Sequence, residues 1–308
     1  MRPDSPTSVI DPAGPRFVDP RVLAKIGSLE LMAKVVVEGF INGLHRSPHL
    51  GLSTDFAEHR QYMPGDDLRR VDWRLYGRTD RYYLKEFEAD TNTTVGVLLD
   101  ISRSMSYASS GISKLDYGRY LAACLLYFSR NQRDRVAFAT FDDAIVEVVP
   151  PSARHLPAAL HAIERIRPGR QGQLGPPLRK LATHFQRRSI LVLISDLYDE
   201  PRNVLDAVSE LRNRGNEIIV MHVLDPAELE FPFDEASSFQ DMESDDRMPV
   251  VPEMMREQYR ALIAAHTAEL SRLLGSHGMD YLLLDTSRPL ENALFDYLSR
   301  RQQLSRVR

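Results

Sequence analysis

Strand-length apolar runs alternate with longer helical patterns through this chain from residue 94 onward. The runs are rich in β-branched residues and shorter than typical helices, so each of them predicts a buried strand. Strands are expected at residues 94–100, 135–141, 189–196, 217–225 and 281–287, with a short edge strand at 144–150. Helical patterns lie near residues 114–131, 155–166, 176–186, 201–214, 252–275 and 289–303. Because such alternation is typical of parallel sheets covered on both faces, the sequence predicts a doubly wound α/β fold with a mostly parallel sheet.

The order of these elements indicates where a ligand would bind. Two of the strands end in aspartates, Asp100 and Asp196, and the expected topology places the switch point of the sheet between these strands. Ligands of doubly wound sheets bind at the carboxyl ends of the strands, where the crossing connections diverge. We therefore expect both carboxylates at one rim of the sheet.

The rest of the chain predicts two outer regions and one insertion. Residues 1–19 are proline-rich and polar, which predicts a disordered tail. Residues 20–93 are expected to pack on, or extend, the main domain, and they begin with one amphipathic helix over residues 21–45. The main domain covers residues 94–308 and contains an acidic segment at 232–250. We expect that segment to be a mobile, solvated insertion, and an acidic binding loop is the alternative.

Composition narrows the classes of function. The net charge of −4 gives no reason to expect binding to nucleic acid or to an anionic membrane. The single cysteine, Cys124, excludes an intrachain disulfide and fits a reducing compartment. No apolar run approaches the roughly 20 residues needed to cross a bilayer, and the first residues lack the pattern of a signal peptide. We therefore expect a cytoplasmic protein without a membrane span.

The strand at 94–100 leads directly into a cluster of oxygen-bearing side chains. Asp100 ends the strand, and Ser102 and Ser104 follow it at alternating positions. Carboxylates and hydroxyls are hard ligands that suit magnesium or manganese rather than zinc. We therefore expect Asp100, Ser102, Ser104 and Asp196 to bind Mg²⁺ or Mn²⁺. The alternative is that Asp100 caps the following turn while the serines satisfy backbone groups.

The Asp-x-Ser-x-Ser pattern after a buried strand resembles the metal-ion-dependent adhesion site of von Willebrand factor A domains. In that family the domain coordinates the metal incompletely, and a carboxylate of a partner can complete the coordination. This sequence departs from the pattern of that family at the third loop, GRQGQLGPPL, where Gly172 stands in the position of the usual threonine. Glycine offers no hydroxyl, so the Gln173 amide or a water would have to substitute, or the metal would bind weakly or not at all.

A second resemblance covers most of the chain, from about residue 40 to residue 301. Its most specific stretch is HRQYMPGDDLRRVDWRLYGR at 59–78, followed by LKEFEAD, by DPAELEFPF at 225–233 and by PLENALFDYLSRR near the C-terminus. Together these segments resemble the domain-of-unknown-function 58 family, bacterial proteins similar to von Willebrand factor A domains. The resemblance implies a partner that is a MoxR-type AAA+ ATPase, and an unknown protein client. Many relatives carry two N-terminal membrane helices, which this sequence lacks.

The segment PGDDLRRVDW within that stretch has two interpretations. Pro64 and Gly65 favour a tight turn, and Arg69 paired with Asp72 could lock that turn beside Trp73. The first interpretation is a structural clasp that fastens the N-terminal region to the sheet. The second is a partner-binding surface, since tryptophan and arginine are enriched at binding hot spots. In the second interpretation Trp73 and Arg69 contact a partner, together with Gln173 at the rim.

The sequence thus predicts a non-enzymatic adaptor that binds a partner or client through the metal rim. Two alternatives remain. One is a structural scaffold that needs no metal, which the missing threonine favours. The other is an aspartate-dependent phosphohydrolase, but that chemistry needs a second aspartate where Ser102 stands. A phosphate-binding loop of the Gly-x-x-x-x-Gly-Lys type is also absent from the sequence, so we do not expect ATP hydrolysis by this chain.

Overall fold

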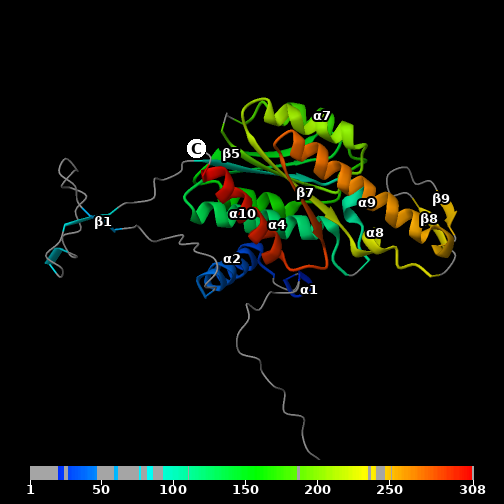
Figure 1. The fold of residues 1–308 in the computed structure, drawn as a ribbon, viewed down its shortest axis with the longest axis horizontal. Helices are drawn as coiled ribbons and strands as arrows, with labels where there is room; N and C mark the ends of the chain where they lie inside the picture. The colour runs from blue at the N-terminus through cyan, green and yellow to red at the C-terminus, as the bar shows by residue number, and fades with distance from the viewer. Residues whose placement is uncertain are drawn as a thin grey trace, which may run out of the picture.

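The computed structural model is organised around a six-stranded sheet (Figure 1). It describes residues 20–23, 27–46, 59–61, 76–77, 82–85, 93–109, 111–185, 188–234, 237–240, 247–250 and 252–306. The strands are β3 (Thr94–Asp100), β4 (Arg135–Phe141), β5 (Ile145–Ser152), β6 (Ile190–Ser195), β7 (Glu217–Leu224) and β10 (Asp280–Asp285). Their order is β10-β7-β6-β3-β4-β5, and every pair is parallel except β4 with β5. The doubly wound α/β fold is therefore confirmed, with its switch point between β3 and β6.

Helices cover both faces of the sheet, as Figure 1 shows. One face carries α2 (Leu29–Arg46), α4 (Lys114–Asn131), α5 (Leu156–Arg165) and α10 (Leu290–Arg306). The other carries α6 (Gly175–Leu181), α7 (Pro201–Arg212) and α9 (Pro252–Ser276). Among the described residues, no helix is both long enough and apolar enough to cross a membrane.

The central strand β3 shows how the sequence builds the two cores. Val95, Val97 and Leu99 point into one apolar cluster, and Leu98 points into the other, as the alternation of side chains along a strand requires. Gly96 faces the second cluster, where a Cβ atom would come within 2.7 Å of the Phe185 ring. The strand is fully buried on both sides, so its last residue is held rigidly at the edge of the sheet.

The N-terminal helical region differs from the single helix predicted for residues 21–45. It is divided into α1 (Pro20–Leu23) and α2, with Ser28 before the first residue of α2. The Ser28 hydroxyl accepts a hydrogen bond from the Leu31 backbone N–H, so a helix cap begins a new helix there. Buried side chains of α2, including Met32 and Val36, belong to the same apolar core as α4. Helix α2 is therefore packed on the main domain.

Other departures concern short elements. Helix α8 (Pro226–Glu230) was not predicted, and the helix expected at 176–186 already ends at Leu181. The acidic segment at 232–250 contains an antiparallel pair of strands, β8 (Ser237–Gln240) and β9 (Arg247–Val250), and its mobility stays a prediction. A second small sheet pairs β1 (His59–Gln61) with β2 (Tyr83–Lys85). The tail at 1–19 lies outside the described residues.

Candidate functional site

The carboxyl end of β3 places Asp100 between two neighbouring strands. Leu99 pairs with Ile194 of β6, so Asp100 lies beside Ser195. Its Oδ2 accepts a hydrogen bond of 2.7 Å from the Ser195 hydroxyl, and its Oδ1 accepts one of 2.8 Å from the Ser102 backbone N–H. Asp100 is buried. The carboxylate is thus fixed in position by the sheet and by the turn that follows it.

The two serines of the motif lie in that turn. Ser102 precedes a short 3-10 helix, Arg103–Ser106, which brings Ser104 back toward it. The two hydroxyl oxygens, Ser102 Oγ and Ser104 Oγ, are 3.1 Å apart, and both residues are buried. The two serine hydroxyls that follow the strand therefore converge on one small volume.

Asp196 follows the last residue of β6 and is also buried. Its Oδ2 accepts a hydrogen bond of 2.9 Å from the Nζ of Lys114, the first residue of α4. The Lys114 ammonium donates a second bond, 2.6 Å long, to Oε1 of Glu228. Lys114 has a relative exposure of 0%, so its charge is neutralised entirely by these contacts inside the protein.

Helix α8 is joined to the site through Asp225 and Glu228. The Asp225 side chain caps the helix by accepting from the Ala227 backbone N–H at 2.8 Å, and Glu228 Oε2 accepts from the Asp225 N–H at 2.8 Å. Asp225 also accepts bonds from the backbone N–H and the hydroxyl of Ser109, in the loop between β3 and α4. The DPAELE part of the sequence thus closes the loop that contains the serines.

The buried charges of the site shift the pKa values of Asp100 and Lys114. Burial, and next the charge of Asp196, raise the pKa of Asp100 from 3.8 to about 7, against the smaller opposing effect of the hydrogen bonds from Ser195 and Ser102. Burial alone would lower the pKa of Lys114, but the charges of Asp196 and Glu228 outweigh it and raise that pKa. Among the described residues, no lysine or arginine forms an ion pair with Asp100. Asp196 therefore has a cationic partner, whereas Asp100 has none within the described part of the chain.

The third loop of the rim passes close to the serines. A Cβ atom on Gly172 would lie 2.7 Å from Ser102 Cβ and 3.9 Å from Asp100 Oδ1. Position 172 is therefore beside the proposed metal ligands, where the resemblance to adhesion sites places a threonine. The same distance gives a physical reason for the glycine, because any larger residue would require Ser102 to move.

The donor set fits a hard divalent cation in part. Asp100, Ser102 and Ser104 offer oxygen ligands within one small volume, and the unneutralised carboxylate would gain a counter-charge. Asp196 is shared with Lys114, which leaves it less available to an ion. The described residues hold no cluster of three or more His, Cys, Asp or Glu side chains, so the serine hydroxyls would have to complete the ligand set.

Of the three residues suggested for partner binding, the structure describes one. Gln173 is exposed, and its backbone N–H donates to the Asp142 carbonyl at 3.3 Å. That the Gln173 amide binds a metal, or contacts a partner, stays a prediction. Trp73 and Arg69 lie outside the described residues, together with most of the stretch at 59–78.

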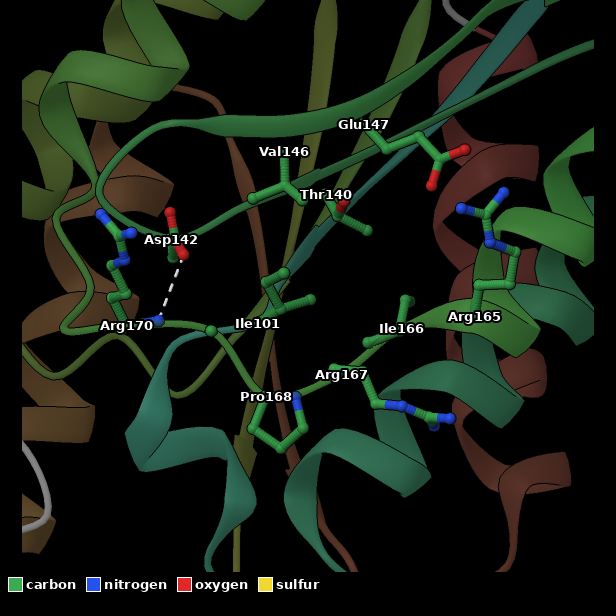
Figure 2. A pocket seen from close by; sticks show the side chains of 11 residues that line it. Ile101, Thr140, Asp142, Val146, Glu147, Arg165, Ile166, Arg167, Pro168 and Arg170 are labelled. Carbon is green, nitrogen blue, oxygen red and sulfur yellow. Dashed lines mark hydrogen bonds between the residues drawn. The ribbon is translucent and has the colours of Figure 1, made fainter.

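A surface hollow of about 570 Å³ lies next to this rim (Figure 2). One wall is formed by the segment 165–170, which starts at the last residue of α5, and the other by Val146 and Glu147 at the start of β5. The hollow shares its backbone with the rim, because Gly169 N–H donates to the Ile101 carbonyl at 2.6 Å.

Sequence reasoning missed Lys114, Ser195 and Glu228. Ser195 stands directly before Asp196, and a hydroxyl beside a strand-end aspartate was a usable signal. The DPAELEFPF stretch contributes to the family resemblance, but the sequence does not indicate that its Asp225 and Glu228 join the site. Lys114 begins an ordinary amphipathic helix, and nothing in the sequence indicates that it pairs with residues 82 and 114 positions away.

Comparison with known proteins identifies relatives over most of the chain. The family model described as "Protein of unknown function DUF58" matches residues 58–269. An uncharacterized protein of Mycobacterium tuberculosis is 28% identical over 276 residues, which cover 88% of this chain and 86% of the relative. An uncharacterized protein of Mycobacterium bovis matches with the same identity and coverage.

Solved structures with similar folds are more distant. BatB, a conserved hypothetical protein from Bacteroides thetaiotaomicron, has a TM-score of 0.48 and 18% identity, covering 68% of this chain and 99% of that one. An aerotolerance-related membrane protein from Bacteroides fragilis has a TM-score of 0.46 and 20% identity, with the same coverage. The von Willebrand factor A domain of SpRpn10 has a TM-score of 0.38 and 10% identity, covering 67% of this chain and 94% of that domain.

Proposed function

The chain belongs to the family described as Protein of unknown function DUF58, and from this premise we propose that it is a non-enzymatic, protein-binding adaptor. Its binding site is the rim formed by Asp100, Ser102, Ser104 and Asp196. Its partners are a MoxR-type AAA+ ATPase, which the resemblance to this family implies, and a protein client. A cytoplasmic location is part of the same proposal.

One observation supports a metal-dependent rim above the others. Asp100 is a buried carboxylate beside a second carboxylate, faces two converging hydroxyls, and lacks a cationic partner among the described residues. A buried charge of this kind is costly unless it is compensated. A bound Mg²⁺ or Mn²⁺ would supply the counter-charge and a coordination position that a carboxylate of another protein could take.

Different residues would fix the two carboxylates of such a site. Ser195 and the Ser102 N–H orient the two oxygens of Asp100. Lys114 fixes one oxygen of Asp196 and thereby limits how many negative charges an ion would meet. The parallel strands β3 and β6 keep the two carboxylates at a constant separation, which a ligand set needs.

The test is the affinity for a purified MoxR-type ATPase from the same organism, measured in Mg²⁺ and in EDTA. We expect EDTA and Asp100→Ala each to weaken binding by about tenfold or more, since a charge-assisted contact is lost. Asp206→Ala, an exposed aspartate on α7, is the matched control and should bind as the wild type does. If chelation and Asp100→Ala both leave the affinity intact, the metal-bridged contact is wrong. If the ATPase does not bind under any condition, the partner assignment is wrong.

A metal-independent scaffold is the second candidate, and Lys114 favours it. Its ammonium already neutralises Asp196, and Gly172 withholds one hydroxyl from the rim. In that case the partner would bind equally well in Mg²⁺ and EDTA. The experiment above separates the two candidates directly.

A further inference from the structure

The hollow beside the rim carries positive charge that the protein itself does not use. Arg165 and Arg167 extend from the segment 165–170 along one side of the hollow, as Figure 2 shows. Both are exposed, and among the described residues neither guanidinium has a hydrogen-bond or ion-pair partner. Two free guanidiniums on one wall form a site for acidic groups, because arginine binds carboxylates through paired hydrogen bonds.

The acidic groups of the hollow cancel its positive charge only in part, because three arginines and two acids line it. Asp142 is occupied by backbone groups: its Oδ2 accepts from the Arg170 N–H at 3.1 Å and its Oδ1 from the Ala144 N–H at 3.1 Å. These bonds, acting against burial, lower the pKa of Asp142 and keep it ionised as part of the loop structure. Glu147, the other carboxylate of the lining, extends from the opposite wall toward Arg165 (Figure 2), and among the described residues it forms no ion pair with an arginine.

Apolar side chains separate the charged groups. Ile101 lies in the middle of the hollow in Figure 2, between Ile166 and Pro168 of one wall and Val146 of the other. Val146 has an exposure of 57%, which is high for a valine on a strand. A lining of this kind fits a chain in which apolar and acidic side chains are interspersed. A continuous run of phosphates would instead meet Glu147 and Asp142 and gain nothing from the apolar surface.

We propose that this hollow binds an extended, acidic segment of a partner protein, with its carboxylates on Arg165 and Arg167 and an apolar side chain against Val146 and Ile166. The contact deepens the proposed function, because it adjoins the rim and names the chemistry of the partner. It needs no metal, so it can fail while the metal-dependent contact holds, and the reverse is also true.

The test uses the full-length protein and a fluorescein-labelled peptide, Glu-Val-Glu-Ile-Asp-Glu, in an anisotropy titration in EDTA at low salt. We expect saturable binding that the double variant Arg165→Glu with Arg167→Glu weakens by about fivefold or more. The matched control is Arg202→Glu with Arg214→Glu, which changes the net charge equally at exposed positions elsewhere. That control should bind the peptide as the wild type does.

Three results would overturn the inference. The first is no binding, or equal weakening by the test and control pairs, which would mean unspecific attraction between charges. The second is tighter binding of a phosphate chain of equal charge, such as a short single-stranded DNA, which would reassign the hollow to nucleic acid. The third is a concentration-dependent dimer that the Arg165→Glu, Arg167→Glu pair abolishes, which would make a second copy of this chain the occupant.

Discussion

At the scale of single residues, Asp100 and Lys114 decide the character of the site. They lie in the same buried region, yet the charge of Lys114 is compensated by two carboxylates, whereas Asp100 has, among the residues that the structure describes, hydrogen bonds but no cation. The sequence predicted a common edge for Asp100, Ser102, Ser104 and Asp196 because they end or closely follow strands, where position is set by sheet geometry. It could not identify Lys114, whose partners are brought to it only by the packing of α4 and α8.

The ionisation of Asp100 should make the metal-free protein less stable as the pH rises. The pKa of Asp100 is about 7 in the folded protein and near 3.8 when unfolded. Protonation of Asp100 therefore favours the folded state, and this contribution to the free energy of unfolding is complete below about pH 4 and is lost by about pH 7. Asp100→Asn removes this loss. Urea unfolding in EDTA should show the variant more stable than the wild type at pH 8, by up to roughly 4 kcal/mol, with the difference disappearing near pH 4. A constant difference across that range would contradict the account.

Removing the Lys114 charge should be strongly destabilising. Lys114→Met leaves Asp196 and Glu228 as buried carboxylates without their cation, which costs about 3–5 kcal/mol. Urea unfolding measures this loss, and Lys180→Met, an exposed lysine on α6, is the control that should change little. Adding Glu228→Gln to Lys114→Met should restore part of the stability. A Lys114→Met protein as stable as the control would show that the buried pairs contribute nothing.

At the scale of elements, sequence patterns located long segments well and short ones poorly. Strands β3 and β4 have the predicted bounds, because each is a mostly apolar run bounded by an aspartate, Asp100 at the end of β3 and Asp142 after β4. Helix α8 has only five residues, too few for a periodic pattern, although Asp225 and Glu228 have the spacing of a capping box. The glycine at 172 was recognised as unusual, but only the close approach of two loops explains it.

The cap of α8 should also hold the serine loop in place. Asp225→Ala removes the bonds to Ala227 at the helix start and to Ser109 in the loop between β3 and α4. We expect a loss of about 1–2 kcal/mol in stability and faster amide hydrogen exchange at Ser109 than in the wild type. Asp206→Ala should leave that exchange rate unchanged. If the Ser109 amide stays protected in Asp225→Ala, the loop is held by other contacts.

At the scale of the whole molecule, the sheet and its two helical layers form a rigid base for one functional edge. The rim lies at the switch point, the hollow adjoins it on the side of β5, and α8 adjoins it on the side of β7. The rim and α8 come from loops after strands, where function is expected in this class of fold, and the hollow adds the segment that follows α5. The overall architecture was predictable because alternating strands and helices restrict the topology, whereas the side-chain pairing across the edge was not.

Isothermal titration of Mg²⁺ and Mn²⁺ into the purified, metal-free protein at pH 8 tests the central claim most directly. The account predicts one ion per chain, with binding lost in Asp100→Ala and retained in Asp206→Ala, and a rise in melting temperature of at least about 3 °C in saturating metal. No binding heat and no change in melting temperature for the wild type with either ion would contradict a metal-binding rim.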